Sequence, residues 1–321
     1  MVKFYKFHGI KIKLSSTIPS IFGIFEKTFG IKPSVQQNYK THIRLNFFHK
    51  NSLARINLPK ESKEKIHLER ERNVKGLYDG KRLFLTDGKS IIKIDYNEGN
   101  ALFSIDPSTL KLKKLFSHTL LPLSLAELMK KFGFYYAHAS CAEINGKGIL
   151  FFGEGGSGKS TACYSLVRKG SKWVSDDAVL LKRNGKNIIA HSFIKEFDLK
   201  TGQESNFREL TTIRSSENGK TDLQNVPKIA CSFIDKTIPK LVIILNYKER
   251  GITSFREARI SDLIGSIIKE NEFIFLNREY SDNILENLIS LAKQCDLKYF
   301  QNKKLVSSSG KFKNNILKIL G

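Results

Sequence analysis

The segment GILFFGEGGSGKSTACYSLVRKG, residues 148–170, limits the folds open to this chain more than any other stretch. An apolar run leads into Gly153-x-x-x-x-Gly158-Lys159-Ser160, and a helical pattern follows. This order of strand, glycine-rich loop and helix is the context in which such a spacing binds phosphate. Glycines let the backbone approach a ligand, and the N–H groups at a helix start attract an anion. The sequence therefore predicts a nucleotide-phosphate site.

Each part of the loop has a predicted task. The glycines are expected to take positive φ and leave room for phosphates. Lys159 should bridge the terminal phosphates, and the Ser160 hydroxyl should ligate Mg²⁺. Glu154 disfavours an anion and should point outward. The predicted nucleotide-binding residues are Gly153, Gly155, Gly156, Ser157, Gly158, Lys159, Ser160 and Thr161, and Lys159 is also predicted to be catalytic.

The strand that leads into the loop constrains the sheet. FYYAHASCAEI, residues 134–144, is predicted to form one strand, and NGKG, residues 145–148, a turn before the strand ILFF. Two strands joined by so short a turn must be antiparallel. In the common P-loop fold, by contrast, the neighbours of the loop strand arrive through helical crossovers. We therefore expect a mixed or antiparallel sheet.

Two adjacent carboxylates, Asp176 and Asp177, follow the predicted strand KWVS and lie 17 residues beyond Lys159. Phosphoryl transfer requires positioning, charge neutralisation and a base. One carboxylate can orient a metal while the other accepts a proton, and the residues alone leave open which does which. The generic alternative is a turn with two solvated carboxylates. His138 lies upstream, and a strand histidine by itself is more often structural.

The stretch AHASCAEINGKGILFFGEGGSGKST…LVRKGSKWVSDDAVLL resembles the catalytic domain of HPr kinase/phosphorylase and its shorter relatives. The histidine, the phosphate loop and the Asp-Asp pair stand at that family's spacing, and the resemblance covers residues 134–184. It implies an α/β fold of the phosphoenolpyruvate-carboxykinase-like P-loop kinase type, with a mixed or antiparallel sheet. The opening segment FYKFHGIKIKLSSTIPS is also similar to the N-terminal module of HPr-kinase-related proteins found with peptide-modifying gene clusters.

The resemblance also implies a reaction. It is the ATP-dependent phosphorylation of a serine hydroxyl, with Mg²⁺ and with a peptide or protein as the partner. Asp176 would be the catalytic base, and Asp177 would ligate the metal together with Ser160. Lys159 would hold the phosphates, and His138 would help to set the nucleophile and phosphate region as a third catalytic residue.

Two departures separate the chain from authentic HPr kinases. Those enzymes have Glu directly after the loop serine, where this chain has Thr161, and their downstream E-x-R-G-x-G signature is missing. The nearest material is NFRELTTIR, residues 206–214. HPr is therefore disfavoured as substrate, and the shorter relatives, which act on ribosomal precursor peptides and small serine-like substrates, fit better. A small-molecule kinase and a nucleotide-gated binding module without transfer chemistry remain the alternatives.

The rest of the chain divides in two. Residues 1–118 are predicted to form a mostly β module for recognition or oligomerisation, with turns at Gly9, Asp79-Gly80, Asp87-Gly88 and Glu98-Gly99. Residues 119–321 are predicted to be the catalytic domain. The further elements we expect are helices over 117–133 (ended by Gly133), 159–169, 259–270 (capped by Ser261), 282–294 and 312–321, a hairpin turning at Asn184-Gly185, strands over 240–247 and 273–278, and an irregular loop over 201–236.

The chain carries a net charge of +23, and its first 120 residues hold 23 Lys and Arg against 10 Asp and Glu. Such a charge attracts nucleic acid, anionic lipid or an acidic protein. The simpler interpretation is a Lys-rich solvated surface. Because residues 36–50 alternate like a strand and lack an RNA-binding signature, nucleic acid is disfavoured, whereas an acidic substrate would suit the charge. No apolar run is long enough to span a bilayer, and no signal peptide is recognised, so we expect a cytoplasmic protein with reduced cysteines. A homo-oligomer is left open.

Overall fold

The protein has a mixed α/β fold, which divides into two compact units. The first unit comprises Met1–Phe134 with Phe275–Arg278, and the second Tyr135–Ile274 with Glu279–Gly321. The domain boundary expected after residue 118 stays a prediction. The computed structural model describes residues 1–34, 40–50, 56, 58–59, 64–67, 74–112, 114–195, 198–200, 207, 220–222, 232–245, 255–270, 275, 277–300, 306 and 308–321.

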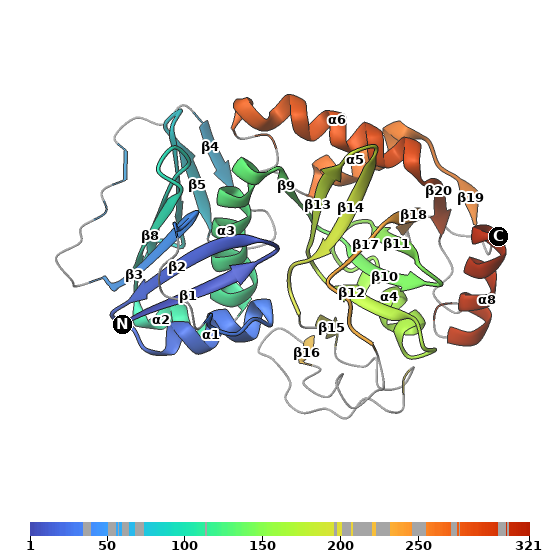
Figure 1. The fold of residues 1–321 in the computed structure, drawn as a ribbon, viewed down its shortest axis with the longest axis horizontal. Helices are drawn as coiled ribbons and strands as arrows, with labels where there is room; N and C mark the ends of the chain where they lie inside the picture. The colour runs from blue at the N-terminus through green and yellow to red at the C-terminus, as the bar shows by residue number, and fades with distance from the viewer. Residues whose placement is uncertain are drawn as a thin grey trace. The chain divides into compact units, whose positions relative to one another are not determined.

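The first unit is built on an eight-stranded sheet in the order β1-β2-β3-β8-β7-β6-β5-β4 (Figure 1). Strands β1 (Val2–Phe7) and β2 (Ile10–Ser16) form the predicted hairpin. His8 and Gly9 between them have φ values of 47° and 84°. Two successive residues at positive φ match the right-handed twist of the flanking strands.

The sheet of the first unit contains both parallel and antiparallel strand pairs. The sequence analysis predicted a mostly β module but no parallel pairs. Strand β3 (Ile43–His49) runs parallel to β2 on one side and to β8 (Asn100–Ile105) on the other. Parallel neighbours require a crossover, and α1 (Ser20–Phe29) supplies it between β2 and β3. Sequence analysis missed this helix. The remaining strands are antiparallel and comprise β4 (Glu64–His67), β5 (Lys75–Tyr78), β6 (Arg82–Thr86) and β7 (Ile91–Asp95).

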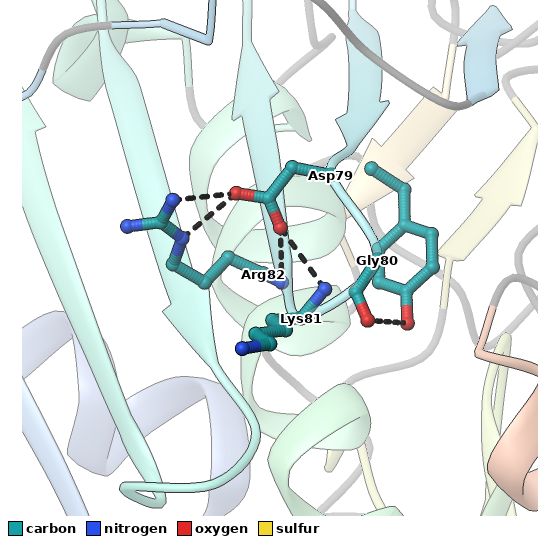
Figure 2. Close-up of polar contacts among 5 residues, drawn as sticks. Asp79, Gly80, Lys81 and Arg82 are labelled. Carbon is teal, nitrogen blue, oxygen red and sulfur yellow. Dashed lines mark hydrogen bonds and ion pairs between the residues drawn. The ribbon is translucent and has the colours of Figure 1, made fainter.

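The turn between β5 and β6 is organised by one carboxylate (Figure 2). Asp79 Oδ1 accepts hydrogen bonds from the backbone N–H groups of Lys81 and Arg82, at 3.0 and 2.8 Å. Asp79 Oδ2 accepts a bond from the Arg82 guanidinium at 2.8 Å. Burial raises the pKa of the Asp79 carboxyl, but these hydrogen bonds and the Arg82 charge more than offset it, so its pKa lies below the ordinary value.

The helix predicted over residues 117–133 is present in a more complex form. A π-helix (Lys114–Leu120) leads into α3 (Leu121–Met129), and a 3₁₀ turn (Lys130–Phe132) follows. The predicted cap is confirmed, because Gly133 takes φ 75° directly after this turn. Every residue of α3 is buried, not one face alone. The short helix α2 (Pro107–Lys111) precedes them and is capped by Asp106.

The second unit has a six-stranded mixed sheet in the order β12-β10-β11-β18-β20-β19. The predicted hairpin is confirmed, since β10 (Ser140–Ile144) and β11 (Lys147–Phe152) are antiparallel neighbours. On its other side β11 runs parallel to β18 (Pro239–Leu245), the buried strand expected over 240–247. The other strands are β12 (Lys172–Ser175), β19 (Arg256–Glu257) and β20 (Asp296–Phe300), of which β19 and β20 were not anticipated.

The single strand predicted over residues 134–144 is wrong. It divides at His138-Ala139 into β9 (Phe134–Ala137) and β10, which belong to different sheets. Strand β9 joins a four-stranded sheet with β13 (Val179–Asn184), β14 (Asn187–Ser192) and β17 (Lys236–Thr237), which contains the predicted hairpin turning at Gly185. A further pair is β15 (Asp198–Lys200) and β16 (Lys220–Asp222).

Helices complete the second unit. Helix α4 (Lys159–Val167) packs against β10, β11 and β12, and α8 (Ser309–Leu320) packs against α4. Helix α5 (Ile260–Glu270) begins one residue before Ser261, so the predicted Ser261 cap is wrong; Asp262 instead accepts a bond from the Arg259 N–H at 2.8 Å. Helix α6 (Arg278–Gln294) is longer than predicted.

The strand expected over 273–278 is wrong where it can be compared, because Phe275 and Asn277 form no strand and Arg278 begins α6; the other three residues lie outside the described residues. Most of the irregular loop expected over 201–236 also lies outside them. Within the described residues, none of the helices combines the length and apolar character needed to span a bilayer.

The lowered pKa of Asp79 predicts a pH dependence. Because the folded state binds the Asp79 proton less tightly than the unfolded chain, whose carboxyl titrates near pH 3.9, this group stabilises the fold above about pH 4. The stabilisation is lost as pH falls through the folded pKa. In urea unfolding at pH 5 and pH 3, wild type should lose more stability than Asp79→Asn. The exposed Asp296→Asn should follow wild type, and an Asp79→Asn chain that also followed wild type would contradict the assignment.

Candidate active site

The candidate site lies at two of the points where the chain passes between the six-stranded and four-stranded sheets of the second unit. A third passage, at Ile238 between β17 and β18, lies near the start of β11, at the other end of that strand from the phosphate loop. The first crossing is His138-Ala139, between β9 and β10, and the second is Asp176–Ala178, between β12 and β13. Because β10 is antiparallel to both β11 and β12, these crossings and the loop after β11 meet at one sheet edge (Figure 1). The predicted site residues therefore converge.

The phosphate loop has the backbone that its glycines predict, with one exception. Gly153, Gly156 and Gly158 take φ values of 137°, 80° and 87°, whereas Gly155 is not at positive φ. A Cβ on Gly153 would lie 2.4 Å from the carbonyl oxygen of Leu245, at the end of β18. The loop can pass this close to β18 only without a side chain. Gly158 then provides the residue before α4.

Lys159 is folded into the loop. Its side chain is buried, and Nζ donates to the carbonyl oxygens of Gly153 at 2.7 Å and Glu154 at 3.2 Å. The buried Ser157 Oγ has no hydrogen-bond partner among the described residues. Ser160 and Thr161 lie half-buried in the first turn of α4. A glycine cradle, an ammonium inside it and a helix N-terminus together fit a polyphosphate.

Glu154 points away from this cradle, as expected. Its side chain is 40% exposed and forms an ion pair of 2.6 Å with Lys269 of α5. The carboxylate that would repel a phosphate is thus turned outward and neutralised.

The two acidic residues differ sharply in environment. Asp176 is completely buried, and its Oδ1 accepts a hydrogen bond of 2.5 Å from the Ser140 hydroxyl. Asp177 is 24% exposed at its side chain and takes φ 64°. The Ala178 N–H donates to the Asp176 carbonyl oxygen at 2.7 Å, so Asp177 is the centre of a γ-turn. Non-glycine residues hold this conformation at a cost of roughly 1–3 kcal/mol, and such strain is concentrated at functional sites.

The strained turn is held from behind by Ser175. The Ser175 hydroxyl donates to the Ala178 carbonyl oxygen at 2.5 Å and accepts a bond from the Phe193 N–H at 3.0 Å. These contacts fix the backbone on both sides of the acidic pair. Sequence analysis missed both Ser140 and Ser175, and the only available signal was a polar residue inside an otherwise apolar strand.

His138 meets the acidic turn. It is buried, and its Nδ1 lies 3.4 Å from Asp177 Oδ1. The structure thus brings His138 to Asp177, and Asp176 to a serine outside the predicted set. Behind them, the free thiols of Cys141 and Cys163 are buried, and burial, with the Asp176 charge, raises the pKa of Cys163 well above its ordinary value. The catalytic and metal roles of these residues stay predictions.

A glycine-rich loop, an acidic turn and a histidine thus lie at one edge of the mixed sheet. Residues 133–197 match the family model described as the HPr Serine kinase C-terminal domain. This segment contains His138, the loop and both acidic residues. The resemblance to an HPr-kinase-like family is therefore confirmed over this part of the chain.

Curated relatives give the same result over similarly short segments. The "HPr kinase/phosphorylase" of Prosthecochloris aestuarii is 38% identical over 55 residues, 17% of this chain and 16% of the relative. That of Chlorobium phaeobacteroides is 38% identical over 65 residues, 20% and 19% of the two chains. That of Mycoplasmopsis pulmonis is 42% identical over 52 residues, 16% and 17%. The chain therefore spans less than a fifth of the length of these relatives.

A solved structure, of the "Hpr(Ser) kinase/phosphatase from Coxiella burnetii", also matches, with 18% identity and a TM-score of 0.32 over 58% of this chain and 99% of that chain. Residues 206–214, the nearest material to the family's downstream signature, lie outside the described residues except for Phe207.

The close approach of Gly153 to β18 generates a prediction. Gly153→Ala places a methyl group against the Leu245 carbonyl oxygen and should distort the cradle, so the rise in melting temperature that we expect Mg²⁺-ATP to produce in wild type should be lost. Gly146→Ala is the control, because Gly146 also has positive φ (77°) but open space around it. If Gly153→Ala kept the wild-type shift, the cradle would be assigned wrongly.

The strain at Asp177 generates another. Positive φ costs alanine about 1–2 kcal/mol but costs glycine little, so Asp177→Gly should be more stable than Asp177→Ala by about 1 kcal/mol in urea unfolding. At Asp282, an exposed position in α6, the order should reverse, because glycine destabilises a helix relative to alanine by about 1 kcal/mol. If Asp177→Ala were instead the more stable variant at position 177, as Asp282→Ala is expected to be at position 282, Asp177 would be unstrained in solution.

Proposed function

We propose that this protein is an ATP-dependent kinase that transfers the γ-phosphoryl group to a serine hydroxyl of a peptide or protein. One observation carries the proposal: the phosphate loop, His138 and the Asp176-Asp177 turn meet at one sheet edge, within a segment similar to HPr kinases. A loop that only binds nucleotide does not require an acidic pair beside it.

The first task of the site residues would be to neutralise the negative charge of the ATP phosphates. The N–H groups at the start of α4 and the Lys159 ammonium would hold the β- and γ-phosphates of ATP. Ser160 and Asp177 would hold Mg²⁺, which lowers the charge on the phosphates. The His138 contact with Asp177 would keep that carboxylate in place.

The acceptor hydroxyl then requires a base. Asp176 is assigned this role: it would take the proton while the serine oxygen bonds to the γ-phosphorus and the bond to the bridging oxygen breaks, releasing ADP. An incoming hydroxyl must come within about 2.6–3.2 Å of this carboxylate. Because Asp176 is buried, the approach of the acceptor has to open a path to it.

The net charge of the chain and its departures from authentic HPr kinases indicate the class of acceptor. A net charge of +23 favours an acidic peptide or protein. Thr161 and the missing downstream signature argue against HPr itself. The cytoplasm is the compartment in which we place this reaction, and a homo-oligomer stays a prediction.

The test is transfer of label from γ-labelled ATP with Mg²⁺ to four acceptors: an acidic serine peptide, its Ser→Ala twin, free serine and HPr. Label is expected on the serine peptide alone. Lys159→Met and Asp176→Asn should each lower the rate by roughly 100-fold or more. Lys186→Met and Asp296→Asn, at exposed positions with matched charge changes, should keep it.

Other outcomes discriminate between the alternatives. Label on free serine but not on the peptide would indicate a small-molecule kinase. A chain that binds ATP but labels none of the acceptors would refute the kinase. Full activity in Asp176→Asn would leave the kinase and remove its assigned base.

A further inference from the structure

Ser140 is a buried hydroxyl that the proposed reaction does not use. It is the first residue of β10, is completely buried, and its hydroxyl lies 2.5 Å from Asp176 Oδ1. The two residues are 36 positions apart in the chain. They meet because Cys141 pairs with Ser175 across β10 and β12, which places the residue before Cys141 beside the residue after Ser175.

The contact has a defined direction. A serine hydroxyl carries one proton, and an ionised carboxylate is an acceptor only, so Ser140 donates and Asp176 receives. Hydrogen bonds to charged acceptors are about twice as strong as neutral ones. A carboxylate without solvent exposure needs such donors, because burial of an unpaired charge is strongly unfavourable.

Ser175 provides an internal comparison. Its hydroxyl is also completely buried and lies next to Asp176 in sequence, but its bonds go to backbone atoms of Ala178, Phe193 and Ile194. Ser175 therefore holds the turn, whereas Ser140 holds the carboxylate. Of these two serines, only Ser140 acts on a side chain that the proposed reaction uses.

We propose that Ser140 is a positioning residue for phosphoryl transfer. It fixes the rotamer of Asp176 so that this carboxylate is aligned to take the acceptor proton, and it does not itself contact substrate. The inference rests on the proposed function. Its size follows from geometry, since misplacement of a reacting group by about 1 Å can cost on the order of 100-fold in rate.

The experiment compares kcat and KM for Ser140→Ala and Ser140→Thr in the full chain, with the labelled-ATP assay. Ser140→Ala should lower kcat by about tenfold or more, with the KM values for ATP and peptide within about twofold of wild type. Ser140→Thr keeps the hydroxyl and should recover most of kcat. If the Ser140→Thr chain does not fold, Ser140→Cys takes its place, because cysteine is smaller than threonine. A thiol is only a weak hydrogen-bond donor, so this variant should recover some of the kcat lost in Ser140→Ala, but less than half of it.

The matched control is Ser165→Ala. Ser165 is equally buried, and its hydroxyl donates to the Val306 carbonyl oxygen at 2.6 Å, away from the acidic pair. A structural role alone would give both alanine variants similar losses of stability and similar kcat. The free energy of unfolding gives a second readout. The losses caused by Ser140→Ala and Asp176→Asn should not add up to the loss in the double variant, because the two side chains share one hydrogen bond.

The outcomes separate the two proposals. Wild type that transfers no label removes the proposed function and, with it, this inference. Active wild type with an unchanged kcat in Ser140→Ala, or with a loss matched by Ser165→Ala, overturns the inference and leaves the kinase in place. A selective kcat loss that the hydroxyl-bearing variant recovers supports it.

Discussion

The antiparallel pairing of β10 with both of its neighbours is the constraint on which the candidate site depends. A turn of two residues, Asn145 and Gly146, forces β10 and β11 to run in opposite directions. Pairing of β10 with β12 on the other side is also antiparallel. The end of β11, the end of β12 and the start of β10 therefore lie together, and each contributes a segment to the site.

Within this frame, strain is distributed unevenly. The described non-glycine residues at positive φ are His8, Asn145 and Asp177. The first two lie in two-residue hairpin turns, where that conformation suits the twist of the strands. Asp177 lies between strands of different sheets, where no hairpin requires it. The fold supports this conformation with Ser175 and a backbone hydrogen bond, which is the pattern of a residue held in place for a task.

Local signals in the sequence predicted most of what local interactions determine. The hairpins at Gly9 and Asn145-Gly146, the loop glycines at 153, 156 and 158, and the outward Glu154 follow from turn chemistry and sterics, and the structure has them. What failed depends on tertiary context. FYYAHASCAEI contains no glycine or proline that would mark the point at which the chain leaves one sheet for another, and residues on both sides of that point are mostly apolar.

For the candidate site, the sequence predicted which residues belong to it but not the environment of each residue. Motif spacing identified the loop, His138 and the acidic pair, but it could not assign different environments to two adjacent aspartates. That difference arises from the register of β10 against β12, which buries one carboxylate against Ser140 and leaves the other beside His138. Register depends on long-range pairing, and a single sequence carries no direct signal of it.

The double crossing between the sheets has a mechanical consequence. The passages at residues 138–139 and 176–178 are joined to each other by side-chain contacts, His138 with Asp177 and Ser140 with Asp176. One crossing cannot move relative to the other without separating these pairs. A molecule bound across the loop and the acidic turn would span the end of β11 and the crossing after β12, so that its binding energy would also oppose the separation of these segments.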